Sequence, residues 1–227
     1  MIKLYDLALA DEDIRPSPYC WKVKFALLHK GLEFETVPLH FAEKDNYPDQ
    51  EHGLLPVLED RDEMIADSGK IIAWLENTFP EKPLTSTPGE RAAVEFYNAW
   101  LGAVLLPTLV PLLFVRIHAA AHEDDKNHYR TTREKKLGAT LEEAASKPGL
   151  KAEAEAAFKT LAMPLAGFRF LGGDTPNLSD YTVFSFVMWM RSVTGDDYLE
   201  LPQPVVAWVE RMLDLFDGYA RKAKRIS

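Results

Sequence analysis

The stretch Ser17-Pro18-Tyr19-Cys20-Trp21-Lys22-Val23-Lys24-Phe25-Ala26-Leu27 contains the start of a predicted helix. Serine is a preferred helix N-cap, and proline is common at the first helical position, which Pro18 would occupy. The apolar pattern continues to Leu28, and Gly31 is suited to the left-handed conformation that ends many helices. This helix lies between two strand-like segments, so the first part of the chain has mixed α/β character.

The segments around this helix follow a regular order. Ile2 to Leu7 alternates apolar and polar residues with the period of a strand. Asp67-Ser68 has the composition of a helix N-terminus, and the helix it begins ends before Pro80. The order β-α-β-(α)-β-β-α therefore predicts a thioredoxin-like domain over residues 1–79. The other expected strands are residues 34–38, 55–60 and 63–66, the last two forming a hairpin.

A proline-rich segment, residues 80–88, is the expected linker to a second domain. From Gly89 onward no convincing strand pattern appears, so residues 89–227 are predicted to form an all-helical C-terminal domain. The fold class is therefore an α/β thioredoxin-like N-terminal domain plus an all-α C-terminal domain. The expected helices are residues 90–118, kinked at Pro107 and Pro111, and then 131–145, 151–170, 181–192 and 204–224.

Composition limits the partners and the location. The 227 residues carry a formal net charge of −9, with a single short basic cluster at residues 221–225, so nucleic acid and anionic membrane are not expected as partners. That cluster is expected to cap the last helix. The chain has one cysteine, no leader-like N-terminus and no long uninterrupted apolar run, which predicts a cytoplasmic protein. The histidines lack metal-ligand spacing, so no metal is expected.

Four short motifs follow one another along the chain: Ser17-Pro18-Tyr19, Leu55-Pro56-Val57, Asp67-Ser68 and Gly172-Gly173-Asp174 followed by Asn177-Leu178-Ser179-Asp180-Tyr181. In this order they resemble the motifs of glutathione transferases. The first helix is further similar to the SPYxWRxKYAL stretch of bacterial β-aryl-ether-cleaving glutathione transferases and of the related fungal etherase-like, serine-type class, and residues 133–138 and 216–218 also resemble that group. The resemblance covers almost the whole chain and implies the glutathione transferase fold, glutathione as co-substrate and a homodimer.

The resemblance assigns the glutathione site to these motifs. Ser17 would be the catalytic residue, donating a hydrogen bond to the glutathione thiolate beside the positive end of a helix. Pro56 would be a cis-proline that lets Leu55 pair with the peptide backbone of glutathione. Ser68 would bind the γ-glutamyl carboxylate and Asp67 its ammonium. The alternatives are a plain N-cap at Ser17 or Asp67 and an edge-strand proline at Pro56.

One position departs from the family pattern. Many relatives carry Gln, Lys or Arg two residues before the cis-proline, and this chain has Leu54. The motifs therefore do not identify the residue that would bind the glycyl carboxylate of glutathione. The candidates are Lys44, Gln50 and His52, each of which could equally be an ordinary surface residue.

The electrophilic acceptor is expected between the domains, against aromatic or amphipathic side chains. Each candidate could instead belong to the core, and Tyr5 is assigned to the core because it lies within the first strand. The candidate acceptor residues are Tyr19, Trp100, Phe114, His118 and Trp189.

Cys20 raises a separate question. The sequence SPYC differs by one atom from CPYC, a dithiol redox motif of glutaredoxin-like proteins, in which the first cysteine is the nucleophile. Cys20 stands in the place of the second cysteine, so a buried and inert thiol is predicted. The alternative is a thiol that forms a mixed disulfide with glutathione.

Three functions follow from these residues. The first is a glutathione transferase in which Ser17 activates the thiolate for attack on aromatic electrophiles, including cleavage of β-aryl ethers. The second is a ligandin-type protein that binds aromatic compounds with weak or no turnover. The third is a structural or interaction protein that has kept the fold and lost glutathione.

Overall fold

The computed structural model describes residues 1–195 and 198–226. The N-terminal domain is built around a four-stranded sheet of order β2-β1-β3-β4, with β1 parallel to β2 and antiparallel to β3. The predicted thioredoxin-like order is therefore confirmed. Its elements are β1 (Ile2–Leu7), α1 (Pro18–Lys30), β2 (Phe34–Leu39), the 3-10 turn η1 (Lys44–Asn46), β3 (Val57–Asp60), β4 (Glu63–Ala66) and α2 (Ser68–Thr78).

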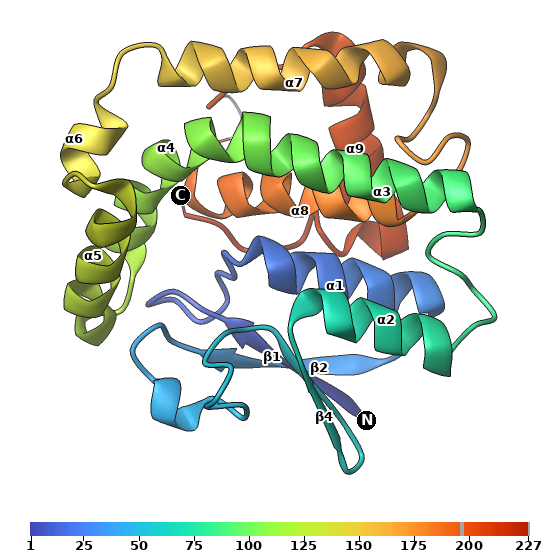
Figure 1. The fold of residues 1–227 in the computed structure, drawn as a ribbon, viewed down its shortest axis with the longest axis horizontal. Coiled ribbons are helices and arrows are strands. Elements are labelled where there is room, and N and C mark those ends of the chain that lie inside the picture. Colours follow the sequence, from blue (N-terminus) through green and yellow to red (C-terminus); the bar gives the residue numbers. More distant parts are fainter. Residues whose placement is uncertain (196–197, 227) are drawn as a thin grey trace.

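The capping residues predicted from the sequence, Ser17 and Gly31, flank helix α1. Ser17 is the N-cap, and its Oγ accepts a hydrogen bond from the Cys20 N–H at 3.3 Å. Gly31, at φ 72°, ends the helix in the left-handed conformation. Together with α2, α1 covers one face of the sheet, and α8 lies on the far side of α1 (Figure 1). The start of α1 is thereby held between the two domains.

The rest of the chain is helical, as predicted. The first long helix is interrupted by a π-helical segment, η2, just before Pro107, and Pro111 lies inside the helix that follows. The helices are α3 (Pro88–Trp100), η2 (Leu101–Leu105), α4 (Leu106–Ala120), α5 (Glu123–Leu137), α6 (Leu141–Ala145), α7 (Leu150–Gly167), α8 (Leu178–Val193) and α9 (Gln203–Gly218).

Two predicted helices differ from the observed ones. The single helix expected over residues 131–145 is two helices, because Gly138 adopts φ 66° and Thr140 forms a capping box with Glu143 that starts α6. The last helix, expected to reach residue 224, has non-helical backbone over residues 215–217. In the basic cluster that follows, the Arg221 guanidinium donates to the backbone carbonyl of Glu210 at 3.2 Å and pairs with the carboxylates of Glu210 and Asp214, all on this helix.

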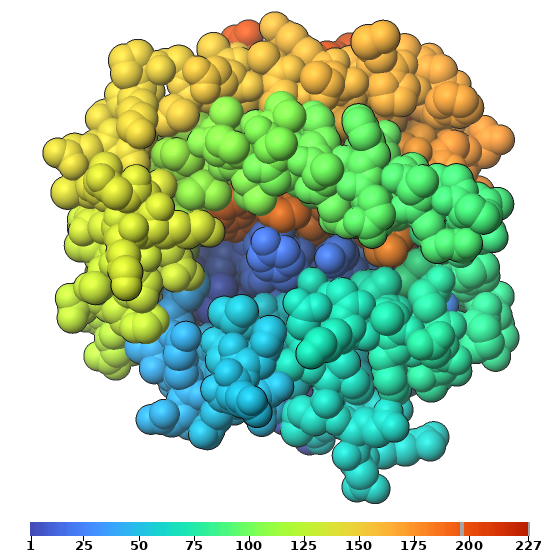
Figure 2. Space-filling view, in the orientation of Figure 1, coloured from blue at the N-terminus to red at the C-terminus, as the bar shows by residue number. Residues whose placement is uncertain are grey.

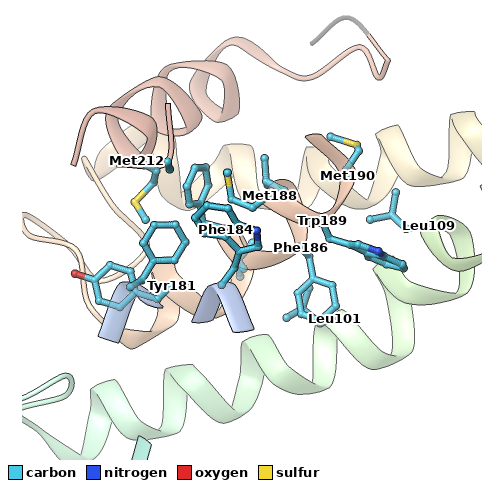
Figure 3. Packing of buried hydrophobic residues seen from close by; sticks show 14 of the residues in the cluster. Leu101, Leu109, Tyr181, Phe184, Phe186, Met188, Trp189, Met190 and Met212 are labelled. Carbon is cyan, nitrogen blue, oxygen red and sulfur yellow. The ribbon is translucent and has the colours of Figure 1, made fainter. Parts of the chain in front are cut away.

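Helix α8 is the centre of the helical domain and is buried along nearly its whole length (Figure 3). Asn177 and Asp180 form a capping box at its start, and Asp180 also accepts a hydrogen bond from Trp208 Nε1 at 2.8 Å. Tyr181 stacks on Phe25 of α1, with ring centroids 5.8 Å apart. The core of one domain is thus continuous with the core of the other.

By length and composition alone, one helical run among the described residues could cross a membrane. The run is the 33 residues Pro88–Ala120; an apolar stretch of 18 residues within it has a mean hydropathy of 1.9 and is half buried inside the molecule. A core helix of a globular protein passes the same test, so this run is weak support for a membrane protein.

Candidate functional site

A cavity of about 420 Å³ lies between the two domains. In Figure 2 it appears as a hollow beneath the green helices of the C-terminal domain and above the cyan and teal N-terminal segments, with blue atoms of the α1 region at its base. Residues from both domains line it: Leu7, Pro16, Ser17, Pro18, Tyr19, Phe41, Lys44, Tyr47, Gly53, Leu54, Leu55, Leu106, Val110, Phe114, Ile117, His128, Tyr129, Thr132, Arg133, Lys136, Phe186 and Trp189.

Ser17 lines this cavity at the N-terminus of α1 and is 6% exposed. Its Oγ accepts from the Cys20 amide, which leaves its O–H proton to donate either to a ligand or to the neighbouring Cys20 thiol. Pro18 has no N–H, and among the described residues the Tyr19 amide makes no hydrogen bond. The hydroxyl of Ser17 and the amide of Tyr19 are therefore two donors at the positive end of a helix, where an anion is stabilised.

Gly53, Leu54 and Leu55 line the cavity beside the start of α1. The Leu55–Pro56 peptide bond is cis, as the family resemblance implied, and Pro56 is buried. Within the described part of the chain, no hydrogen bond satisfies the Leu55 amide. This amide is therefore free to pair with an extended peptide.

Asp67 and Ser68 lie at the start of α2 and are not among the residues that line the cavity. Asp67 caps the helix by accepting from Gly69 N at 2.8 Å and from Lys70 N at 3.1 Å. Burial raises the pKa of Tyr19, and the Asp67 carboxylate raises it further. The start of α2 is thus close to the cavity, although Ser68 itself is buried.

Of the candidates for binding a glycyl carboxylate, the structure brings Lys44 to the cavity. Gln50 donates from Nε2 to the Asp45 carbonyl at 2.7 Å, and neither Gln50 nor His52 lines the cavity. Lys44 is exposed and enters no ion pair with the described residues. Its charge is therefore available to a ligand.

The predicted acceptor residues separate into two groups. Tyr19, Phe114 and Trp189 line the cavity, and the rings of Phe114 and Trp189 meet edge to face with centroids 6.2 Å apart. The structure does not bring Trp100 or His118 to the cavity. Trp100 is buried at the end of α3, and His118 lies one turn beyond Phe114 on α4, with its ring centroid 6.3 Å from that of Tyr129.

Helix α5 supplies a side of the cavity that the motifs did not identify: His128, Tyr129, Thr132, Arg133 and Lys136. The helix is held in place by buried Asp125, which accepts from Phe41 N at 3.1 Å and Ala42 N at 2.7 Å across the domain boundary. Asp125 and the lining residues share one face because they recur at helical spacing. That spacing is the sequence signal that could have revealed them.

Cys20 lies one turn into α1, fully buried, and does not line the cavity. Burial raises the pKa of its thiol well above the ordinary value, and the Asp6 carboxylate raises it further. A thiol in this environment is held in the protonated form. Among the described residues no group of three His, Cys, Asp or Glu side chains could hold a metal ion.

Comparison with known proteins agrees with this architecture. Residues 92–219 match the model of the glutathione S-transferase C-terminal domain, and residues 13–83 match that of the N-terminal domain. The chain belongs to the glutathione S-transferase family. Both halves of the cavity therefore come from segments that characterise this family.

Individual relatives are distant. Glutathione S-transferase Z1 of Arabidopsis thaliana is 32% identical over 80 residues, which are 33% of this chain and 36% of that protein. Glutathione transferase omega-1 of Caenorhabditis elegans is 25% identical over 189 residues, 81% of this chain and 65% of that protein. A glutathione S-transferase of Ceriporiopsis subvermispora, crystallised with glutathione, matches with a TM-score of 0.75 at 23% identity, covering 98% of this chain and 94% of that one. The match to the plant protein spans about a third of its length, and the structural match shows the shared fold.

Proposed function

We propose that this protein is a glutathione transferase in which Ser17 stabilises the glutathione thiolate for attack on an aromatic electrophile. The observation that carries the proposal is the position of Ser17, at a helix N-terminus in a cavity with aromatic side chains on the opposite side. Family membership and the fold shared with a relative crystallised with glutathione support it.

The chemistry rests on the thiol pKa. A free thiol titrates near about 8.5, so little thiolate exists at neutral pH. The Ser17 hydroxyl and the Tyr19 amide would each donate a hydrogen bond to the sulfur, beside the positive end of α1. Each hydrogen bond that favours the anion lowers the thiol pKa, and each unit of pKa corresponds to about 1.4 kcal/mol.

The remainder of glutathione would lie along the N-terminal domain. The free Leu55 amide would pair with the cysteinyl backbone, and Lys44 would bind the glycyl carboxylate. Asp67 and Ser68 would meet the γ-glutamyl ammonium and carboxylate at the start of α2. This arrangement leaves the thiol directed toward the aromatic side of the cavity.

The reaction that we infer for this site is cleavage of an aryl ether next to a ketone. The thiolate forms a carbon–sulfur bond at the carbon that bears the aryloxy group, and the carbon–oxygen bond breaks. The electron pair of that bond leaves with the oxygen as a phenolate, which takes a proton from water. The nucleophile is the co-substrate, so the protein supplies orientation and charge stabilisation.

The test is glutathione-dependent release of a fluorescent phenol from an α-aryloxy ketone by wild type, Ser17→Ala and Cys20→Ser. We expect Ser17→Ala to lose at least about tenfold in kcat/KM, because one hydrogen bond to a charged group is worth roughly 1.5–3 kcal/mol. Cys20→Ser should keep most of the activity. Thr87→Ala removes a similar N-cap at α3 and controls for helix stability. Loss of activity in Cys20→Ser alone would contradict the serine mechanism.

A second candidate, a ligandin-type protein, is favoured by the size of the cavity and its aromatic lining. In that case the wild type would bind aromatic compounds and glutathione without releasing phenol.

The proposal includes a homodimer, which the family resemblance implies. Sedimentation velocity tests this oligomeric state.

A further inference from the structure

The charge of the cavity is opposite to that of the whole chain. The chain has a formal net charge of −9, with 35 acidic and 26 basic residues. Yet among the described residues that line the cavity there is no Asp or Glu, whereas Lys44, Arg133 and Lys136 are all present. A cavity with this composition favours a negatively charged occupant.

The cations are not neutralised by the protein. None of these three residues enters an ion pair with a described residue. Arg133 is half-buried, and its guanidinium lies 4.7 Å from the ring centroid of Tyr129 and 5.7 Å from those of Phe41 and Phe114. The guanidinium lies among these three aromatic rings. It donates a hydrogen bond from Nη1 to the Thr132 hydroxyl at 3.0 Å and has the Tyr129 hydroxyl as a second partner. Most of its donors therefore remain available.

A buried hydroxyl lies beside this guanidinium. Tyr129 is 1% exposed; burial raises the pKa of its hydroxyl, while the charge of Arg133 and a side-chain hydrogen bond with Arg133 lower it. Because a guanidinium can only donate, the Tyr129 oxygen accepts this bond and keeps its O–H proton, which an anionic ligand atom could accept. Arg133 and Tyr129 together form a site for an oxygen anion.

Glutathione does not account for all three cations. In the proposed function, Lys44 binds its single glycyl carboxylate from the N-terminal domain, and the γ-glutamyl end lies at the start of α2. Arg133 and Lys136 belong to α5 of the other domain, beside Phe114 and Tyr129. They lie with the aromatic residues expected to hold the acceptor.

We propose that the acceptor is an aromatic compound that carries its own anionic group, a carboxylate, sulfonate or phenolate, bound by Arg133 and Tyr129 with Lys136 nearby. The aromatic ring would lie against Phe114 and Trp189, and the anion would orient the electrophilic carbon toward the thiolate. This inference rests on the proposed transferase function and adds the substrate class.

The first experiment requires no turnover. Calorimetric titration compares 3,5-dinitrobenzoate with 3,5-dinitrobenzamide, which have the same ring and differ in charge. We expect the wild type to bind the carboxylate at least about tenfold more tightly, since hydrogen bonds to charged groups are worth roughly 1.5–3 kcal/mol. Arg133→Gln should remove that preference, and Arg133→Lys should restore part of it. Lys135→Gln is the matched control, because Lys135 is exposed on the same helix and does not line the cavity.

The second experiment uses turnover with glutathione. Thiolate attack on 4-chloro-3,5-dinitrobenzoate forms a carbon–sulfur bond and expels chloride with the bonding electron pair; the methyl ester reacts in the same way without the charge. Arg133→Gln should raise KM for the carboxylate about tenfold and leave KM for the ester and for glutathione unchanged.

Three results would overturn the inference. The first is equal binding of the carboxylate and the amide by the wild type. In the second, Arg133→Gln weakens both ligands equally, which indicates a packing role. In the third, it raises KM for glutathione alone, which assigns the guanidinium to the glycyl carboxylate. Preferential carboxylate binding without any turnover would support the anion site and contradict the transferase function, so the two failures are distinguishable.

Discussion

At the scale of single residues, Cys20 shows how burial decides reactivity. Its side chain is fully buried, and burial followed by the Asp6 carboxylate raises its thiol pKa. Because the thiolate is the reactive form, we predict that the native protein reacts slowly with a thiol reagent at pH 7.5 and reacts fully once unfolded in urea. Absorbance of the released chromophore measures the rate. Rapid stoichiometric labelling of the native protein would show that Cys20 is accessible and revive the mixed-disulfide alternative.

Lys44 is predicted to replace the clamp residue that is missing at Leu54. Lys44→Met should raise KM for glutathione by about tenfold, with little change in kcat, because it removes a charge-assisted hydrogen bond to the ground state and the transition state alike. Steady-state kinetics with varied glutathione measure this. Lys147→Met, at an exposed position outside the cavity, is the control. An unchanged KM would leave the glycyl carboxylate to another residue.

The sequence motifs identify cavity residues best where the backbone conformation determines the position of the residue. Ser17 and Leu55 were identifiable because a helix N-terminus and the residue before Pro56 have fixed geometry. Trp100 and His118 are candidates because of their chemistry, but their positions depend on the rotation of α3 and α4, which are separated by the π-helical segment η2, and α4 contains Pro111. When both sides of a helix are apolar, the sequence does not indicate which side faces the cavity.

At the scale of elements, α5 was the least predictable part of the site. The helix is charged along its length, and Asp125 and Tyr129 are its buried residues. An apolar stripe, the usual signal for the buried face, is therefore absent. For the same reason, the predicted start of this helix, Thr131, lies eight residues after the observed start, Glu123. The helical spacing of Asp125 and the cavity-lining residues is the local signal for its inner face, and the hydrogen bonds that Asp125 accepts from Phe41 and Ala42 of the other domain hold that face in place.

Asp125 therefore offers a test of how α5 is held. Asp125→Ala leaves the Phe41 and Ala42 amides without their acceptor, and we predict a loss of about 3 kcal/mol in the free energy of unfolding. Because α5 carries Arg133 and the loop after β2 carries Lys44, KM should rise for both substrates. Urea unfolding and steady-state kinetics measure the two effects. Asp124→Ala, with a side chain 88% exposed, is the control and should change neither quantity.

At the scale of the whole molecule, α1 and α8 join the two domains. His29 Nδ1 and the Tyr181 hydroxyl are 2.8 Å apart across this interface. Burial lowers the pKa of His29, and the Lys30 and Lys82 charges lower it further. A hydrogen bond from the imidazole N–H to the Pro83 carbonyl and the Glu76 charge raise it. The neutral imidazole is therefore the form that the folded interface favours.

This arrangement predicts acid sensitivity. Because the folded pKa of His29 lies below its ordinary value of 6.5, the unfolded chain binds more protons in the interval between the two values. The contribution of His29 to the free energy of unfolding is complete above pH 6.5 and falls as the pH drops from 6.5 toward the folded pKa. His29→Gln keeps a partner for the Tyr181 hydroxyl but cannot take up a proton, so it should lose less stability than wild type between pH 7.5 and 5.5.

Urea unfolding at the two pH values measures this difference. The pKa of His118 is lowered by burial as well, so part of the acid sensitivity should persist in the variant. His52→Gln removes a histidine in the loop before Pro56 and should unfold like wild type at both pH values. Because the α1–α8 contact buries residues of both domains, tryptophan fluorescence should report one cooperative transition. Two transitions would mean that the two domains unfold separately, and equal acid sensitivity in His29→Gln and wild type would mean that protonation of His29 is not coupled to this interface.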